Sequence, residues 1–439
     1  MESLPPELLL EIAKYLPFYS GQILRVKTSD QRLLSIPRGR RQIYASAIQI
    51  FTVTSHHVHE HEELGELEFA SLQNLLVPFT LYAPGTSFPY SCLVGYMVPS
   101  LRAVWLGSGV NGSILNALAT LCHRLRCISL NLDAFHMTED STLDFLSKCS
   151  SLEDINLYCS SASTLSPRIL RKLAVYKNLR ELHIAEPKQD TIEAADLKSI
   201  PQPFSSLQRL EIDTSPERAS VLIPSVRGIR ELSLAFGRFA PELTFTGRTL
   251  RILSSHLREL RCLDITFFAS VRIPPDDIVY LRELTQLRQL NLLTRRQAEI
   301  EIPGFDDTHF QALISELVGL RGLSLSCTRR RLATACLIAL AESCPLLYSC
   351  MVSSLEVNPL ELQACRAPLF PNMEELSFSG FVPEPGNDEA PTAYLKCRGL
   401  DIPADMQKFT KAVEKAWARN RRAQGKRIRT LRQRIVAWA

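Results

Sequence analysis

The stretch L-R-E-L-H-I at residues 179–184 has the pattern L-x-x-L-x-L, which returns as L-Q-R-L-E-I at residues 207–212. The same frame extends in both directions, giving twelve copies between Leu72 and Met373 with a mean spacing of about 27 residues. Leucine-rich repeats have periods of about 20 to 29 residues. Individual gaps run from 22 to 33 residues, so the array is irregular.

Each copy predicts a short strand with three inward apolar side chains, and such a strand must stack on its neighbours to bury them. Apolar spacing near three and four residues between the copies predicts helices. The endings C-S-S-L at 149–152 and C-P-L-L at 344–347 resemble the cysteine-containing type of leucine-rich repeat. The expected fold class is therefore α/β, with a leucine-rich-repeat solenoid (horseshoe) of about 12 irregular repeats over residues 72–378.

The segment L-P-P-E-L-L-L-E-I-A-K-Y-L-P at residues 4–17 predicts an amphipathic helix that begins near two prolines and ends at a third. It resembles the opening of an F-box, a three-helix module that docks onto the Skp-type adaptor of a cullin-RING ubiquitin ligase. The family's usual Cys and Trp are absent from V-K-T-S-D-Q-R-L-L at 26–34. The resemblance implies that the adaptor-binding residues are Leu4, Pro5, Glu7, Leu8, Ile12, Leu16 and Leu24. The alternative is a plain helix that caps the first repeat.

Five segments follow from these patterns. They are an F-box-like helical module (1–45), a connector with a His-rich segment (46–71), the repeats (72–378), a Pro-rich linker (379–405) and a basic amphipathic C-terminal helix (406–439). An F-box followed by such repeats implies the substrate-recognition subunit of an SCF-type E3 ligase, which binds a target protein and is not itself an enzyme. A repeat scaffold outside the ubiquitin system is the alternative.

The third and fifth positions of each copy should face the concave surface, because side chains alternate along a strand. Mostly acidic residues stand there, and we expect them to bind the target: Asp154, Glu181, His183, Glu211, Glu231, Asp264 and Glu375. The second position is Arg in seven copies: Arg102, Arg126, Arg180, Arg230, Arg261, Arg288 and Arg321. Packing over neighbouring repeats and pairing with nearby acids explains these arginines, and a basic or phosphorylated target is the functional alternative.

A glycine-rich segment, G-S-G-V-N-G, places Gly107, Gly109 and Gly112 between an expected strand and an expected helix. A dinucleotide-binding fingerprint has this context, and Asp133 lies 21 residues past Gly112, where a ribose-binding acid stands. Both flanking strands already belong to the repeat frame, so a glycine-rich turn is the simpler interpretation. A dinucleotide-dependent enzyme remains the less favoured alternative.

Four histidines cluster in S-H-H-V-H-E-H-E-E, from His56 to His61. Alternating histidines on one strand face could bind zinc, whereas a solvated loop is the alternative. We expect neither a metal nor a cofactor.

Composition is that of an ordinary globular protein, with 46% hydrophobic and 22% charged residues. The net charge of +4 is uneven, because residues 406–439 hold eleven bases and one acid. This tail is a cap on the last repeat, a nuclear-localisation or nucleic-acid patch, or a membrane-surface helix. No run of about 20 apolar residues and no secretory signal are visible, which favours a cytoplasmic or nuclear protein without a membrane span. The twelve scattered cysteines are expected to be buried rather than disulfide-bonded, and nucleic acid is not an expected partner.

Overall fold

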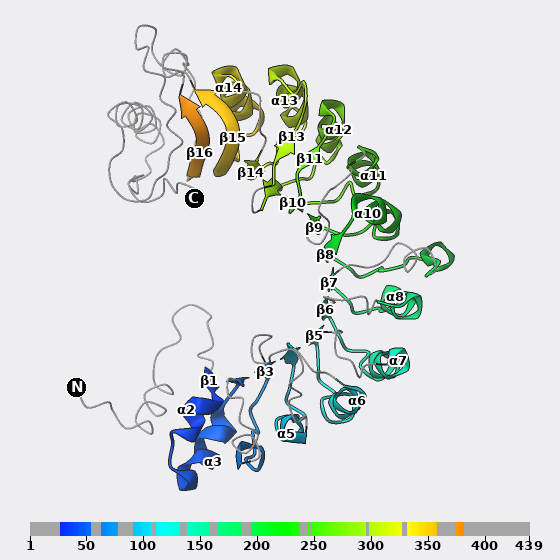
Figure 1. Cartoon of the computed structure of the whole chain (residues 1–439), viewed down its shortest axis with the longest axis vertical. Helices are drawn as coiled ribbons and strands as arrows, with labels where there is room; N and C mark the ends of the chain where they lie inside the picture. Colours follow the sequence, from blue (N-terminus) through cyan, green and yellow to red (C-terminus); the bar gives the residue numbers. More distant parts are fainter. Residues whose placement is uncertain are drawn as a thin grey trace, which may run out of the picture. The chain divides into compact units, whose positions relative to one another are not determined.

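The computed structural model describes residues 27–53, 63–77, 91–107, 111–131, 138–158, 165–185, 195–237, 245, 247–295, 298–326, 332–357, 370, 372 and 375–381. The chain divides into two compact units, Met1–Ser163 and Thr164–Ala439. Within each unit, parallel strands alternate with helices, and the helices lie along one side of the strands (Figure 1).

The first unit has six parallel strands among its described residues. In pairing order they are β1 (Lys27–Ser29), β2 (Ile50–Thr52), β3 (Asn74–Val77), β4 (Ala103–Leu106), β5 (Cys127–Asn131) and β6 (Asp154–Tyr158). The helices between them are α2 (Asp30–Leu34), α3 (Arg38–Ala47), α5 (Ser91–Val94), α6 (Gly112–Leu121) and α7 (Glu139–Lys148).

The second unit continues the same plan with eight parallel strands among its described residues. They are β7 (Glu181–Ala185), β8 (Arg209–Thr214), β9 (Glu231–Phe236), β10 (Cys262–Phe267), β12 (Gln289–Thr294), β14 (Gly322–Leu325), β15 (Ser349–Val357) and β16 (Glu375–Phe381). A separate parallel pair joins β11 (Val271–Arg272) to β13 (Ile300–Glu301).

Among the described residues of the second unit, α8 precedes β7, and helices lie between the successive strands from β7 to β15. The α-helices are α8 (Pro167–Ala174), α10 (Pro216–Leu222), α11 (Arg248–His256), α12 (Pro275–Val279), α13 (Asp307–Ile314) and α14 (Thr334–Ser343). Three short 3-10 helices are η2 (Leu197–Ser199), η3 (Ile223–Ser225) and η4 (Tyr280–Glu283).

The leucines of the L-x-x-L-x-L pattern form continuous buried rows because the strands stack without a register shift. The second leucine of the pattern is at most 2% exposed along the row Leu182, Leu210, Leu232, Leu263, Leu290 and Leu323. Full burial of one such side chain contributes about 1.5–3 kcal/mol before entropy is charged against it. The stacked rows therefore form the core of the second unit.

The first unit has the same inner row, built from Phe51, Leu75, Val104, Ile128 and Ile155. Three aromatic side chains pack together in the core of its first repeats. The rings of Phe51, Phe69 and Tyr96 are fully buried, with centroids 5.0 to 5.3 Å apart. Such tilted and edge-on contacts stabilise the fold beyond the contribution from the buried area of each ring.

One backbone arrangement repeats where each strand begins. The residue after the first leucine uses its carbonyl oxygen to accept two N–H groups from the next repeat. Arg230 O, for example, accepts from Arg261 N at 2.7 Å and Cys262 N at 3.0 Å. The same pair of bonds joins Arg102 to Arg126 and Cys127 in the first unit. Each strand thus sets the starting residue of the strand that follows it.

Several helices begin at a side chain that accepts one of the otherwise unpaired N–H groups of the first turn. Asn111 Oδ1 accepts from Ile114 N at 3.0 Å at the start of α6. Ser166 Oγ accepts from Ile169 N at 3.2 Å at the start of α8, where Pro167 occupies the first turn. The described helices include no candidate for a membrane-spanning segment.

The expectation of a three-helix F-box-like module followed by a solenoid of about 12 repeats is wrong. Strand β1 lies inside residues 1–45 and pairs with β2, which in turn pairs with β3. Parallel strands therefore begin well before Leu72, and residues 27–45 belong to the α/β stack rather than to a separate helical module.

The physical reason for this error is visible in the two early strands. Ile48, Phe51 and Val53 occupy the pattern positions and are at most 2% exposed, but a phenylalanine replaces the central leucine. Strand β1 reads K-T-S and has no apolar pattern at all. Its pairing comes from backbone hydrogen bonding to a neighbour, which side-chain periodicity does not report.

Candidate protein-binding face

The strands of the second unit present polar side chains on the face opposite the leucines. Glu181, Arg209 and Glu231 are register partners on β7, β8 and β9. His183 and Glu211 are partners one step further along, and Asp264 follows two strands later. We call this set of six residues the acidic face. Adjacent strands lie about 4.8 Å apart, so the set forms one surface.

The carboxylates of the acidic face are only loosely paired. Arg209 lies between two of them, with Nη1 at 3.9 Å from Glu181 Oε2 and Nε at 3.9 Å from Glu231 Oε2. His183 Nδ1 is 3.9 Å from Glu211 Oε1. The side chains of Arg209, Glu181 and Glu231 are half exposed, so these pairs contribute little to stability. The negative charge remains open to a partner from solvent.

Asp264 is the most enclosed carboxylate of the acidic face. Burial raises the pKa of its carboxyl group, and the nearby Glu211 carboxylate acts in the same direction. Hydrogen bonds from Asn291 and Thr266, and the charge of Arg295, oppose that rise. Thr266 Oγ1 lies 3.4 Å from Asp264 Oδ1. These neighbours fix the direction in which the carboxylate points.

Sequence reasoning missed Asp213, which continues the alternation of β8 one step beyond Glu211. Asp213 is 4% exposed, and its register partners are Ala185 on β7 and Ala235 on β9. The period-2 pattern would have found it if it had been followed past the third leucine.

The structure brings together five of the seven predicted target-binding residues: Glu181, His183, Glu211, Glu231 and Asp264. Asp154 begins β6 in the first unit, where Asn156 Nδ2 donates to its Oδ1 at 3.0 Å. Glu375 begins β16, six strands beyond β8 in the pairing order of the second unit. The seven adaptor-binding residues predicted between Leu4 and Leu24 lie outside the described residues.

The strand face of the first unit differs in character. Along β3–β6 its half-buried side chains include Leu76, Trp105, Asn156 and Tyr158. Asp154 is the one acid at the described face positions of these strands. This face is therefore nearly neutral and partly aromatic.

The seven predicted arginines at the second pattern position are all exposed. Arg126 Nη1 lies 3.2 Å from Glu153 Oε1 of the next repeat, which is the kind of pairing that the sequence predicts. Their backbone carbonyls supply the double hydrogen bonds at the strand starts. Each of these arginines directly precedes the first residue of a strand.

The glycine-rich segment forms part of the repeat structure. Gly107 N donates to Val77 O at 2.8 Å, continuing the pairing of β4 with β3. Gly112 is the first residue of α6 and follows its cap, Asn111. Gly109 and Asp133 lie outside the described residues, as do the histidines from His56 to His61. The described part of the chain contains no cluster of His, Cys, Asp and Glu suited to a metal ion.

The prediction of buried cysteines is confirmed for five of the seven whose side chains the structure describes, and all seven are free thiols. Burial raises the pKa of Cys122, Cys344 and Cys350 to about 12 and that of Cys149 to about 11. These thiols are protonated at neutral pH and poor nucleophiles. They act as small core residues.

No model of a known protein family matches the chain, and no curated protein is similar to it. A solved structure, the crystal structure of the Rad7 and Elc1 complex in yeast, is similar with a TM-score of 0.40 and 14% sequence identity. That similarity covers 81% of this chain and 77% of the other. A TM-score at this level carries no argument about function.

Proposed function

We propose that the chain is a protein-binding repeat protein whose acidic face holds a basic segment of a partner. The observation that carries this proposal is the register of the acidic face, which places Glu181, Glu211, Glu231 and Asp264 on four adjacent strands. Rigid strands hold these carboxylates at fixed spacing, so little entropy is lost when a partner binds. In this proposal the chain performs no bond chemistry itself.

The finer proposal is that the bound partner is a target for ubiquitination. Residues 4–24 resemble the adaptor-binding start of an F-box, so the chain would act as the substrate-recognition subunit of an SCF-type ligase in the cytoplasm or nucleus. Support for this step comes from the sequence of that segment alone. A repeat scaffold outside the ubiquitin system would share the acidic face and lack adaptor binding.

Two measurements test the two levels separately. For the face, the full chain is titrated with a Lys- and Arg-rich peptide, comparing wild type with Glu211→Lys/Glu231→Lys. We expect affinity to fall about tenfold at low salt and the difference to shrink at high salt, because exposed charges are screened. The variant Asp144→Lys/Glu342→Lys makes the same charge change on exposed helix positions and should bind like wild type. Equal affinity in all three proteins would contradict the proposed face.

For the ligase, purified Skp-type adaptor is used to capture the chain. Wild type should be retained, and Leu8→Asp/Ile12→Asp should be lost, because an apolar interface tolerates buried charge poorly. Unchanged circular dichroism would show that the variant is folded. A folded wild-type chain that fails to bind the adaptor leaves the scaffold as the function.

A further inference from the structure

A second charged surface lies at the edge of the second unit where the strands begin. The segments 177–180, 205–208, 227–230, 258–261 and 282–288 lead into β7, β8, β9, β10 and β12. We call them together the basic edge. They hold two acids, Glu259 and Glu283, and eight exposed bases, which are Lys177, Arg180, Arg227, Arg230, Arg258, Arg261, Arg282 and Arg288. The basic edge therefore carries a formal charge of +6.

The backbone of the basic edge is held by the double hydrogen bonds at the strand starts. Arg180 O accepts from Gln208 N at 2.8 Å, and Gln208 O accepts from Arg230 N at 2.8 Å. Ser206 Oγ donates to Lys177 O at 2.5 Å and ties the two preceding turns together. The side chains at this edge thus project from a fixed frame.

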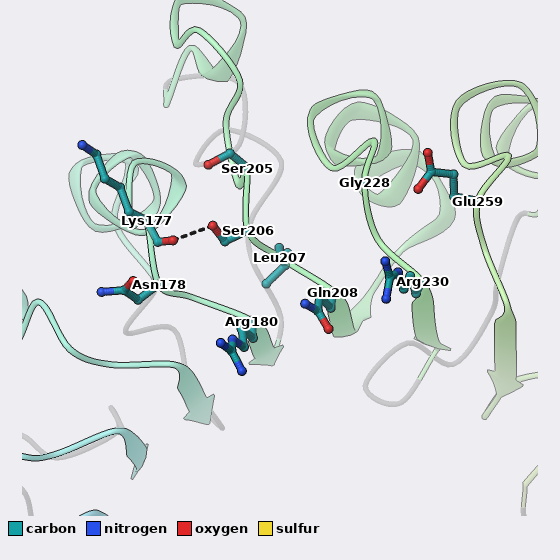
Figure 2. A pocket seen from close by; sticks show the side chains of 10 residues that line it. All are labelled: Lys177, Asn178, Arg180, Ser205, Ser206, Leu207, Gln208, Gly228, Arg230 and Glu259. Carbon is teal, nitrogen blue, oxygen red and sulfur yellow. Dashed lines mark hydrogen bonds between the residues drawn. The ribbon is translucent and has the colours of Figure 1, made fainter.

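A hollow of about 360 Å³ opens in the basic edge between the turns that precede β7, β8 and β9. Figure 2 shows Arg180, Gln208 and Arg230 in a row where these strands begin, with Lys177 and Asn178 on one side. The lining of the hollow is polar and includes two serines, Ser205 and Ser206. Glu259 is its one acid. Lys177, Arg180 and Arg230 are the three cationic residues of its lining.

Lysine and arginine groups around a polar hollow suit a compact anion. A guanidinium offers paired N–H donors to the oxygens of a carboxylate or phosphoryl group, and amide and hydroxyl groups supply further donors. Gln208 separates Arg180 from Arg230 in the row, so an anion there meets a neutral donor flanked by two charges.

We propose that the basic edge binds an anionic peptide segment of the partner, with one carboxylate or phosphoryl group seated in the hollow between Lys177, Arg180 and Arg230. The proposal rests on the proposed function in that the ligand belongs to a protein partner. A peptide fits better than a nucleic acid because Glu259 and Glu283 interrupt the row of bases, and a continuous phosphate backbone would meet both. The edge and the face together would recognise a partner with acidic and basic stretches.

The test is titration of the full chain with three fluorescent peptides of equal length, one Glu-rich, one carrying phosphoserines at the same positions and one carrying serines. Both anionic peptides should bind with an affinity that falls as salt is raised, and the serine peptide should not bind. Arg180→Glu/Arg230→Glu should weaken anionic-peptide binding at least tenfold. Gln208→Glu places an acid in the middle of the hollow and should weaken it several-fold.

Arg209→Gln is the matched control, because it lowers the charge by one, as Gln208→Glu does, and Arg209 follows Gln208 directly but belongs to the acidic face. It should leave anionic-peptide binding unchanged while strengthening binding of the basic peptide. Equal loss in Arg209→Gln and Gln208→Glu would overturn the proposal, since it would indicate a general charge effect.

The remaining arms identify the anion. Tighter binding of the phosphoserine peptide assigns the hollow to a phosphoryl group, and equal binding assigns it to a carboxylate. A single-stranded oligonucleotide that binds more tightly than both peptides, and is lost in the same variants, would overturn the peptide proposal. Binding to the acidic face is measured separately, with the basic peptide and the variant Glu211→Lys/Glu231→Lys. Loss of the proposal for the basic edge can therefore be distinguished from loss of the proposed function.

Discussion

The two units bury the same kind of core and present different strand faces. Behind the strands, apolar side chains stack row upon row in both, with Leu75 in the first unit and Leu263 in the second fully buried. On the open face, the first unit shows Leu76, Trp105 and Tyr158, whereas the second shows the acidic face. Side chains alternate along a strand, so packing in the core constrains only the inward positions. The outward positions can therefore differ between the units and carry function.

The largest expected effect concerns what the two units share. Leu75→Ala and Leu263→Ala each delete a fully buried side chain in a stacked row, and each should cost about 2–5 kcal/mol of unfolding free energy. Urea unfolding followed by circular dichroism measures both. A loss below about 1 kcal/mol in one unit only would show that its rows are not equally packed.

A smaller effect is expected at the helix starts, which the units also share. Asn111→Ala removes the cap of α6 and Ser166→Ala the cap of α8, and each should cost about 1 kcal/mol. The same urea measurement applies, with Asn111→Asp and Ser166→Thr as controls that keep an accepting oxygen. No difference between alanine and control variants would contradict the capping role.

Chemical labelling should report the local charge of each face. Cys127 and Cys262 are both half-buried on the first face row of their strands, and each has an acidic register partner, Asp154 for Cys127 and Glu231 for Cys262. Glu231→Gln should lower the ratio of iodoacetamide to iodoacetate labelling rates at Cys262 by about two- to fivefold and leave the ratio at Cys127 unchanged, because exposed charges act with about 0.4 to 1 kcal/mol. Mass spectrometry gives both rates in one sample. The change should vanish at high salt, and a change that persists would indicate altered steric access instead.

The smallest expected effect is on stability, and it compares removal of a more buried charge with removal of an exposed charge on the acidic face. The raised pKa of Asp264 means that its charged form is disfavoured in the folded state, so the carboxylate lowers stability once the pH exceeds both its unfolded value, near 3.8, and its folded value. Asp264→Asn should therefore raise the melting temperature at pH 7, and the gain should disappear as pH falls below about 3.8. Glu231→Gln removes a half-exposed charge from the neighbouring strand and should change stability less.

The sequence predicted strand positions well where leucines repeat and poorly where they do not. The frame at Leu182 and Leu210 locates buried positions, and simple alternation then locates Glu181 and Glu211 on the opposite face. β2 was missed because Phe51 stands in place of a leucine, although Ile48 and Val53 hold the other two positions.

The hollow in the basic edge was beyond sequence reasoning for a different reason. Lys177, Gln208 and Arg230 come from three repeats and line one hollow only because backbone hydrogen bonds align the strand starts. Periodicity identifies the arginines one by one, but the space between them depends on turn lengths and on Ser206 holding Lys177 O. Sequence spacing alone carries no information about such a cavity.

The carbonyl that accepts two amides at each strand start also explains how an irregular chain keeps a regular surface. Repeat lengths vary from 22 to 33 residues, yet β8, β9, β10 and β12 pair without a shift. The two hydrogen bonds to the carbonyl of the preceding repeat fix the register of each strand. Extra residues in the loop before a strand therefore do not shift the positions of the side chains on that strand. Loops on the helix side can therefore lengthen, shorten or accept an inserted peptide while the order of charges along the strands is preserved, which makes them natural sites for tags and reporters.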